Sequence, residues 1–178
     1  FVFGRGSEEA LELARNGIAF EVVPGVSAAT GCAARAGIPL THRGLATGVR
    51  FITGHRMTKE DAEGELELNW PSLADPATPL VVYMGLANLA AVTEKLIEHG
   101  LSASTPAVAI EQGTLPGQRI VRATLADIAQ KATIAGLEPP TLAIIGKVAA
   151  LSEALQWFTS YASENAEYPV APVTKLSQ

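Results

Sequence analysis

The chain has 178 residues, of which 48% are hydrophobic and 17% charged, so it can bury a sizeable core and is not globally disordered. Its net charge of −5 and its lack of a basic face argue against binding nucleic acid. The single cysteine, Cys32, excludes an internal disulfide and fits a reducing, cytoplasmic compartment. Because no uncharged apolar run is long enough, we expect no membrane span.

Strand and helix patterns alternate along the chain, which indicates an α/β fold. Glycine and proline mark most of the boundaries between these patterns. In chain order, they predict the end of a strand at residues 1–3, a helix at 7–15, a buried strand at 19–23, a helix at 27–36, strands at 49–54 and 79–84, a helix at 89–97, strands at 107–111 and 119–123, a helix at 124–135, a strand at 142–148 and a helix at 152–161.

This order suggests a division into domains. We interpret the parts as the carboxyl-terminal part of a first α/β domain at residues 1–42, a linker at 43–48, a second α/β domain at 49–160 and a mobile tail at 161–178. The sequence opens inside an apolar run rather than at a methionine, so we expect the beginning of the first domain to lie upstream of Phe1. The acidic segment 56–69 resembles a surface insertion.

The glycine turn at the start of the chain holds the first residues that point to a ligand. Arg5 follows a strand end, where open α/β sheets bind ligands, and a guanidinium suits carboxylate or phosphate. An ion pair with Glu8 or Glu9 explains the same arginine equally well. Glu9 also stands where a dinucleotide fingerprint has its third glycine, so we expect no standard nucleotide site. The histidines have no ligand spacing, so we expect no metal site.

Other positions are open to a ligand role or a structural one. Ser27 and Ala28 begin a helix, where the local sequence favours an ordinary cap. Met84 ends a buried strand just before Gly85, and filling the core is the usual role of such a methionine. Gly113 follows a further strand, where it allows either a turn or the approach of a ligand to the backbone.

Taken in order, short motifs in this chain resemble the uroporphyrinogen-III C-methyltransferases, which belong to the tetrapyrrole methylase superfamily. The motifs are FVFGRGSEE at residues 1–9, VVPGVSAA at 22–29, GIPLTHR at 37–43, TGH at 53–55, YMG at 83–85, EQGT at 111–114 and IIGKV at 144–148. The first three are the specific ones, since the later ones indicate only the superfamily. The resemblance runs from residue 1 to about residue 158.

The resemblance implies a two-domain α/β enzyme of the tetrapyrrole methylase fold, with its first domain incomplete in this chain and a ligand cleft between the domains. It implies a homodimer that uses S-adenosyl-L-methionine as methyl donor, releases S-adenosyl-L-homocysteine and needs no metal. The implied reaction methylates uroporphyrinogen III at C-2 and C-7, giving precorrin-2 by way of precorrin-1. That product serves sirohaem, cobalamin or haem d1 biosynthesis.

The same resemblance implies roles for individual residues. Arg5 would bind a substrate carboxylate or orient the macrocycle, and Glu8 would position Arg5 or assist proton transfer. The family's Gly-Gly-Asp-Pro loop, proton-accepting aspartate and proton-donating lysine are expected upstream of Phe1, so we expect these 178 residues alone to be inactive. The implied donor-binding residues are Val2, Ser27, Ala28, Met84 and Gly113.

Two alternatives stay open. The first is another precorrin methyltransferase of the cobalamin pathway, against which the FGRG turn and the THR segment argue. The second is a non-catalytic fragment or binding module, because the expected upstream loops are not part of this sequence.

Overall fold

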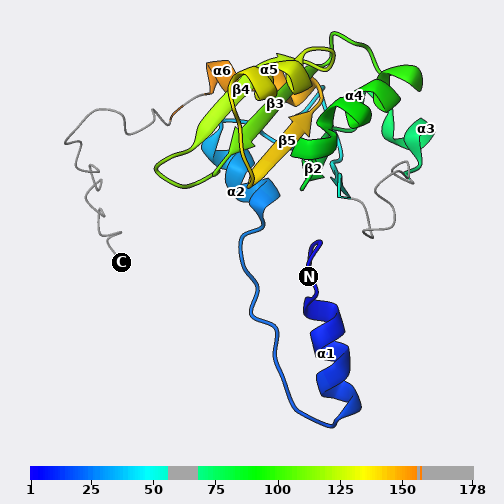
Figure 1. Ribbon diagram of the computed structural model, residues 1–178, viewed down its shortest axis with the longest axis vertical. Coiled ribbons are helices and arrows are strands. Elements are labelled where there is room, and N and C mark those ends of the chain that lie inside the picture. The colour runs from blue at the N-terminus through cyan, green and yellow to red at the C-terminus, as the bar shows by residue number, and fades with distance from the viewer. Residues whose placement is uncertain (56–67, 156, 158–178) are drawn as a thin grey trace, which may run out of the picture.

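A mixed sheet of five strands, in the order β1-β2-β5-β3-β4, forms the centre of the computed structural model, which describes residues 1–55, 68–155 and 157 (Figure 1). β1 and β2 run parallel, whereas the other neighbouring strands in this sheet are antiparallel. These pairings make β1, β2 and β3 run in one direction, so their carboxyl ends share one edge. The strands are β1 (Arg50–Thr53), β2 (Leu80–Tyr83), β3 (Pro106–Glu111), β4 (Arg119–Thr124) and β5 (Thr141–Ile145).

Helices cover both faces of the sheet and complete a three-layer α/β arrangement. One face carries α3 (Trp70–Leu73), α4 (Leu89–Glu98) and α5 (Ile128–Ile134). The opposite face carries α2 (Ala28–Arg35) and the 3₁₀ helix η3 (Lys147–Ala150). The other helices in the part of the chain that the structure describes are α1 (Gly6–Arg15), the 3₁₀ helix η2 (Leu86–Asn88) and α6 (Leu151–Ala154).

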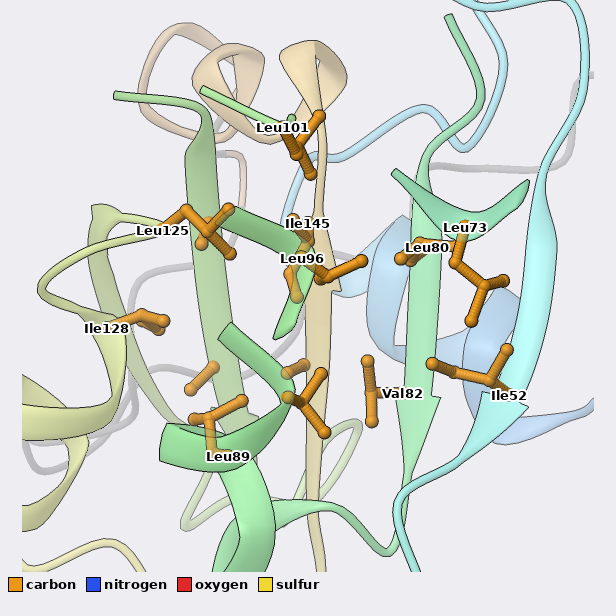
Figure 2. Close-up of a cluster of buried hydrophobic side chains, with 14 of the residues drawn as sticks. Ile52, Leu73, Leu80, Val82, Leu89, Leu96, Leu101, Leu125, Ile128 and Ile145 are labelled. Carbon is orange, nitrogen blue, oxygen red and sulfur yellow. The ribbon is translucent and has the colours of Figure 1, made fainter. Parts of the chain in front are cut away.

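Side chains of the central strands alternate between two apolar clusters. Leu80 and Val82 of β2 belong to the cluster beneath α4, while Val81 belongs to the cluster beneath α2. Figure 2 shows the first cluster, in which Leu89 and Leu96 of α4 lie over the strands. Because both faces are covered, the strands read as continuous apolar runs, and the sequence places them correctly to within a few residues.

The helix α2 packs on the sheet through small side chains. Ala29, Ala33 and Ala36 are buried there, in one cluster with Val108 of β3 and Ile144 of β5. Alanine adds little thickness between helix and sheet, so the backbone of α2 lies close over the strands. The alanine-rich sequence of this helix is typical of such close packing.

The structure contradicts the strand predicted at residues 19–23. That segment has no regular structure, and Val23 is 78% exposed. A strand needs a neighbour for its backbone N–H and C=O groups, and no strand among the described residues pairs with this segment. Residues 1–3 likewise form no strand, and Phe3 has a left-handed φ of 51°. Figure 1 shows α1 and its extended connection apart from the sheet, and α1 buries no residue.

Two helix boundaries also differ from the prediction. The helix expected from Thr124 begins at Ile128, because Thr124 still belongs to β4 and its hydroxyl donates to the Asp127 carboxylate at 2.9 Å in the turn that follows. The last helix is described only over Leu151–Ala154. It ends there, with Leu155 as its C-cap and Trp157 outside any helix, so the predicted helix at 152–161 is wrong at these two residues. Residues 156 and 158–161 of that prediction, the tail at 161–178 and most of the insertion, at 56–67, lie outside the described residues. The proposed domain boundaries stay predictions.

A buried carboxylate joins β3, β4 and the end of α5. Glu111 is 4% exposed and accepts a hydrogen bond from Arg119 Nε across the β3–β4 hairpin. Its other oxygen accepts from the backbone N–H of Glu138 at 3.2 Å. Arg119 also donates to the carbonyls of Ala135 and Gly136 at 3.0 and 2.7 Å. The hydrogen bond from Arg119 is the largest cause that lowers the pKa of Glu111.

Replacing this carboxylate should change how stability depends on pH. We expect Glu111→Gln to lower the thermal midpoint at neutral pH and to flatten the loss of stability in acid. Because the folded-state pKa is lowered, the charge of Glu111 stabilises the fold above the ordinary glutamate pKa of about 4.3, and that contribution is lost as pH falls through the folded-state value. Thermal unfolding from about pH 7 to pH 3 tests this, with Glu94→Gln on the exposed side of α4 as control. Parallel curves for wild type and Glu111→Gln would contradict it.

Candidate functional site

A cavity of about 730 Å³ lies at the shared carboxyl edge of β1, β2 and β3, beside the start of α2. Its volume is in the range of about 300–1,000 Å³ that is usual for small-ligand sites, and the edge is where α/β sheets commonly bind ligands. Most of its wall is apolar. The lining residues are Ala28, Cys32, His55, Tyr83, Met84, Leu86, Ala87, Ile110, Gln112, Gly113, Leu115, Pro139, Pro140, Thr141 and Leu142.

Three of the predicted donor-binding residues meet in this cavity although they are far apart in the sequence. Ala28 comes from the first turn of α2, Met84 follows β2, and Gly113 follows β3. Ser27 is the N-cap residue of α2, as predicted, but its side chain makes no capping hydrogen bond and does not line the cavity. It lies next to the wall, where its hydroxyl accepts a hydrogen bond from Tyr83 at 3.4 Å.

Gly113 is required by the packing of α2. A Cβ atom at this position would lie 2.2 Å from Cys32 Sγ and 3.3 Å from Ile110 Cγ2. The φ angle of Gly113 is outside the left-handed region, so steric contact is what excludes a side chain. The missing side chain therefore lets α2 approach the end of β3.

Three residues beside the cavity adopt a left-handed backbone although they are not glycine. Met84, Gln112 and Thr114 have φ angles of 51°, 46° and 73°. The Thr114 N–H donates to the side-chain oxygen of buried Gln118 at 2.8 Å, which holds the turn after β3. Such strain is concentrated at ligand sites. Met84 is 51% exposed, so the interpretation of this residue as core filling is wrong.

The ends of β1 and β2 come together through two glycines. A Cβ atom on Gly54 would lie 2.5 Å from the Cα atom of Gly85, so the two backbones could not approach with a larger residue there. Asn88 Nδ2 donates to the Gly54 carbonyl at 2.6 Å and fixes the contact. His55 and Met84, which lie next to these two glycines in the sequence, both line the cavity.

The predicted catalytic pair lies outside the cavity wall. Arg5 Nε donates to Glu8 Oε2 at 2.5 Å, and both side chains are mostly exposed. The bond to Glu8 raises the pKa of Arg5. The ion pair expected as an alternative to ligand binding is therefore present. Val2 also does not line the cavity, but its neighbour Phe3 packs on Tyr83 with ring centroids 5.1 Å apart, which joins the first turn to the site.

Several lining residues were not proposed from the sequence. Tyr83, Gln112 and His55 lie in the recognised motifs, and their shared position just at or after strand ends was the available signal. Leu115 and Pro139 carried no such signal. Cys32 is buried, and burial raises the pKa of its thiol.

Neither a cluster of metal ligands nor a helix that could span a membrane is present in the part of the chain that the structure describes. Among residues 1–55, 68–155 and 157, no group of three or more histidine, cysteine, aspartate or glutamate side chains is arranged to hold a metal ion. Within the same part of the chain, no helix has the length and apolar character needed to cross a membrane.

The structure defines an α/β protein with a cavity at the strand ends whose size is typical of small-ligand sites. The sequence then assigns the chain to a family. Residues 1–129 match the tetrapyrrole (corrin/porphyrin) methylases, and the chain belongs to this family. It is 51% identical over 158 residues to a siroheme synthase of Azotobacter vinelandii, covering 89% of this chain but 33% of that protein. The chain thus spans about a third of that relative's length.

Solved structures agree with this assignment. A uroporphyrin-III C-methyltransferase from Thermus thermophilus superposes with a TM-score of 0.70 at 38% identity, covering 87% of this chain and 63% of that one. A structure of the Thermus thermophilus enzyme complexed with S-adenyl homocysteine has a TM-score of 0.68 at 35% identity, covering 83% of this chain and 59% of that one. The tetrapyrrole methylase fold predicted from the motifs is therefore confirmed.

The close packing of Gly113 against Cys32 gives a prediction about the stability of the fold. We expect Gly113→Ala to destabilise the protein by about 1–3 kcal/mol, the usual cost of overpacking, because the new methyl group meets the sulfur. Adding Cys32→Ala removes the sulfur and should restore most of the loss, although Cys32→Ala alone is destabilising. Denaturant unfolding of the two single variants and the double variant measures the coupling. Additive effects of the two substitutions would contradict this account.

Proposed function

We propose that the protein containing this chain is a uroporphyrinogen-III C-methyltransferase, which transfers methyl groups from S-adenosyl-L-methionine to C-2 and C-7 of uroporphyrinogen III and gives precorrin-2 through precorrin-1. The observation that carries the proposal is the cavity that gathers Ala28, Met84 and Gly113 in a chain of the tetrapyrrole methylase family. The Thermus thermophilus complex with S-adenyl homocysteine supports the choice of donor.

The cavity fits the chemistry of such a donor. When bound, S-adenosyl-L-methionine supplies an electrophilic methyl group on a positively charged sulfur. The largely apolar wall, including Met84 and Leu115, suits the flat adenosine and excludes water from the transfer. Gly113 contributes backbone to the cavity wall, and the place that its Cβ would take is filled by Cys32. Ser27 lies next to this wall, and Val2 precedes Phe3, which packs on Tyr83 of the wall. We assign Val2 and Ser27 contacts with the outer part of the donor.

Arg5 is assigned to the other substrate. Uroporphyrinogen III carries eight carboxylates, and a guanidinium binds a carboxylate through paired, charge-assisted hydrogen bonds. Arg5 is exposed and already bound to one carboxylate, that of Glu8. We therefore propose that a substrate carboxylate binds Arg5, with Glu8 holding the guanidinium in place beforehand. We also propose that the enzyme is a homodimer and acts in the cytoplasm.

Product analysis tests the reaction. The full-length protein that carries this sequence should convert uroporphyrinogen III first to a singly and then to a doubly methylated product, with NMR placing the methyl groups at C-2 and C-7. Methylation of a later precorrin but not of uroporphyrinogen III would favour the precorrin methyltransferase alternative. Binding of S-adenosyl-L-homocysteine without methyl transfer to either would favour a binding module.

A substitution at Arg5 separates substrate binding from donor binding. We expect Arg5→Ala in the full-length protein to reduce kcat/KM for uroporphyrinogen III by about 10- to 100-fold, the usual effect of losing a hydrogen bond to a charged group. The Kd for S-adenosyl-L-homocysteine should not change, because Arg5 lies outside the cavity wall.

Arg15→Ala is the matched control for this experiment. Arg5 is the N-cap residue of α1 and Arg15 is its last residue, and Arg15 contacts Glu12 at 3.6 Å with the same spacing of three residues. This variant should keep the activity of the wild type. Unchanged kinetics in Arg5→Ala, or equal losses in the two variants, would remove Arg5 from the proposed site.

A further inference from the structure

The hydroxyl of Tyr83 acts as a cap for α2 although it comes from the sheet. The backbone N–H of Ala29 donates to Tyr83 Oη at 2.9 Å, and Tyr83 Oη donates to Ser27 Oγ at 3.4 Å. The first N–H groups of a helix have no partner within it, and Ser27 makes no capping bond of its own. Tyr83 therefore bonds to both neighbours of Ala28, to the backbone of Ala29 and to the side chain of Ser27, and Ala28 itself lines the cavity.

The ring of Tyr83 makes a second set of contacts. It packs against Phe3 with ring centroids 5.1 Å apart and against Phe51 of β1 at 5.9 Å. Phe3 lies two residues before Arg5 in the turn that begins the chain. Tyr83 also lines the cavity directly before Met84. One side chain thus contacts the cavity, the start of α2 and the turn that carries Arg5.

We propose that Tyr83 is a positioning residue that holds the donor cavity and the substrate-binding turn at a fixed position relative to each other. The inference rests on the proposed function. The hydroxyl sets the position of Ser27 and Ala28 for the donor, and the ring sets the position of Phe3, and through it Arg5, for the tetrapyrrole. Methyl transfer from sulfur to carbon requires an in-line arrangement of two separately bound molecules. A side chain that contacts both binding regions meets that requirement directly.

The two parts of this role can be tested separately in the full-length protein. Tyr83→Phe keeps the ring and removes the hydroxyl, so the Kd for S-adenosyl-L-homocysteine should rise by about 3- to 10-fold, as expected for a lost hydrogen bond. Phe3→Leu removes the ring contact and keeps the hydroxyl. It should reduce kcat/KM for uroporphyrinogen III with an unchanged Kd for S-adenosyl-L-homocysteine. Calorimetric titration and steady-state kinetics measure the two quantities.

Thr133→Val is the matched control for the lost hydroxyl. Thr133 is exposed on α5, outside the cavity wall, and its hydroxyl donates to the Ala129 carbonyl at 3.0 Å. This variant should bind S-adenosyl-L-homocysteine like the wild type. Thermal unfolding of each variant shows whether it is folded. If Tyr83→Phe does not fold, Phe3→Leu still tests the coupling, because Phe3 lies on the exposed turn.

The results distinguish a failure of the positioning role of Tyr83 from a failure of the proposed methyltransferase function. If the wild-type protein binds S-adenosyl-L-homocysteine and Tyr83→Phe binds it equally well, the positioning role is wrong while the proposed function stands. An unchanged kcat/KM in Phe3→Leu would overturn the link to the substrate turn. If the wild-type protein does not bind S-adenosyl-L-homocysteine, the proposed function fails and the inference falls with it.

Discussion

The site depends on the close approach of α2 to the end of β3, where Gly113 faces Cys32. The Cβ that Gly113 lacks would lie 2.2 Å from the sulfur, so any other residue would push the helix and the turn apart. Ala29 and Ala33 keep the rest of the helix equally close to the sheet. One packing contact therefore serves both purposes, because it completes the core beneath α2 and forms the wall of the cavity.

Backbone strain then shapes the edge of the cavity. Left-handed residues without glycine's freedom cost roughly 1–3 kcal/mol each, and Met84, Gln112 and Thr114 all adopt this conformation. Hydrogen bonds compensate locally, since the Gln112 N–H donates to the Pro140 carbonyl at 3.0 Å and Thr114 N–H to the Gln118 side chain. β2 and β3 consequently end beside the cavity, and the residues that follow them, Met84 and Gln112, line it.

The sequence predicted the sheet better than the site. Strands such as β2 and β3 were predictable because burial on two faces produces unbroken apolar runs. The same pattern at residues 19–23 gave a wrong strand, because an apolar run does not show whether a neighbour is available for pairing. Met84 and Gly113 were predicted as donor-binding residues only from the family resemblance. Their local sequence also fitted a core residue and a turn residue, respectively. Tyr83 was missed because its bond to Ala29 spans 54 residues, which no local pattern reveals.

The separation of apolar cavity and charged turn explains how an acidic chain can act on a polycarboxylate in the proposed reaction. The whole chain carries a net charge of −5, which repels such a substrate at long range. Arg5 and Glu8 form an ion pair exposed to solvent, and such pairs contribute little to folding stability. The Arg5 guanidinium can therefore exchange the Glu8 carboxylate for a substrate carboxylate at little expense to the fold. In the proposed reaction the apolar cavity wall takes no part in that exchange, so donor and substrate would bind through chemically different groups. Tyr83, in its proposed role, would hold the two binding regions at fixed relative positions.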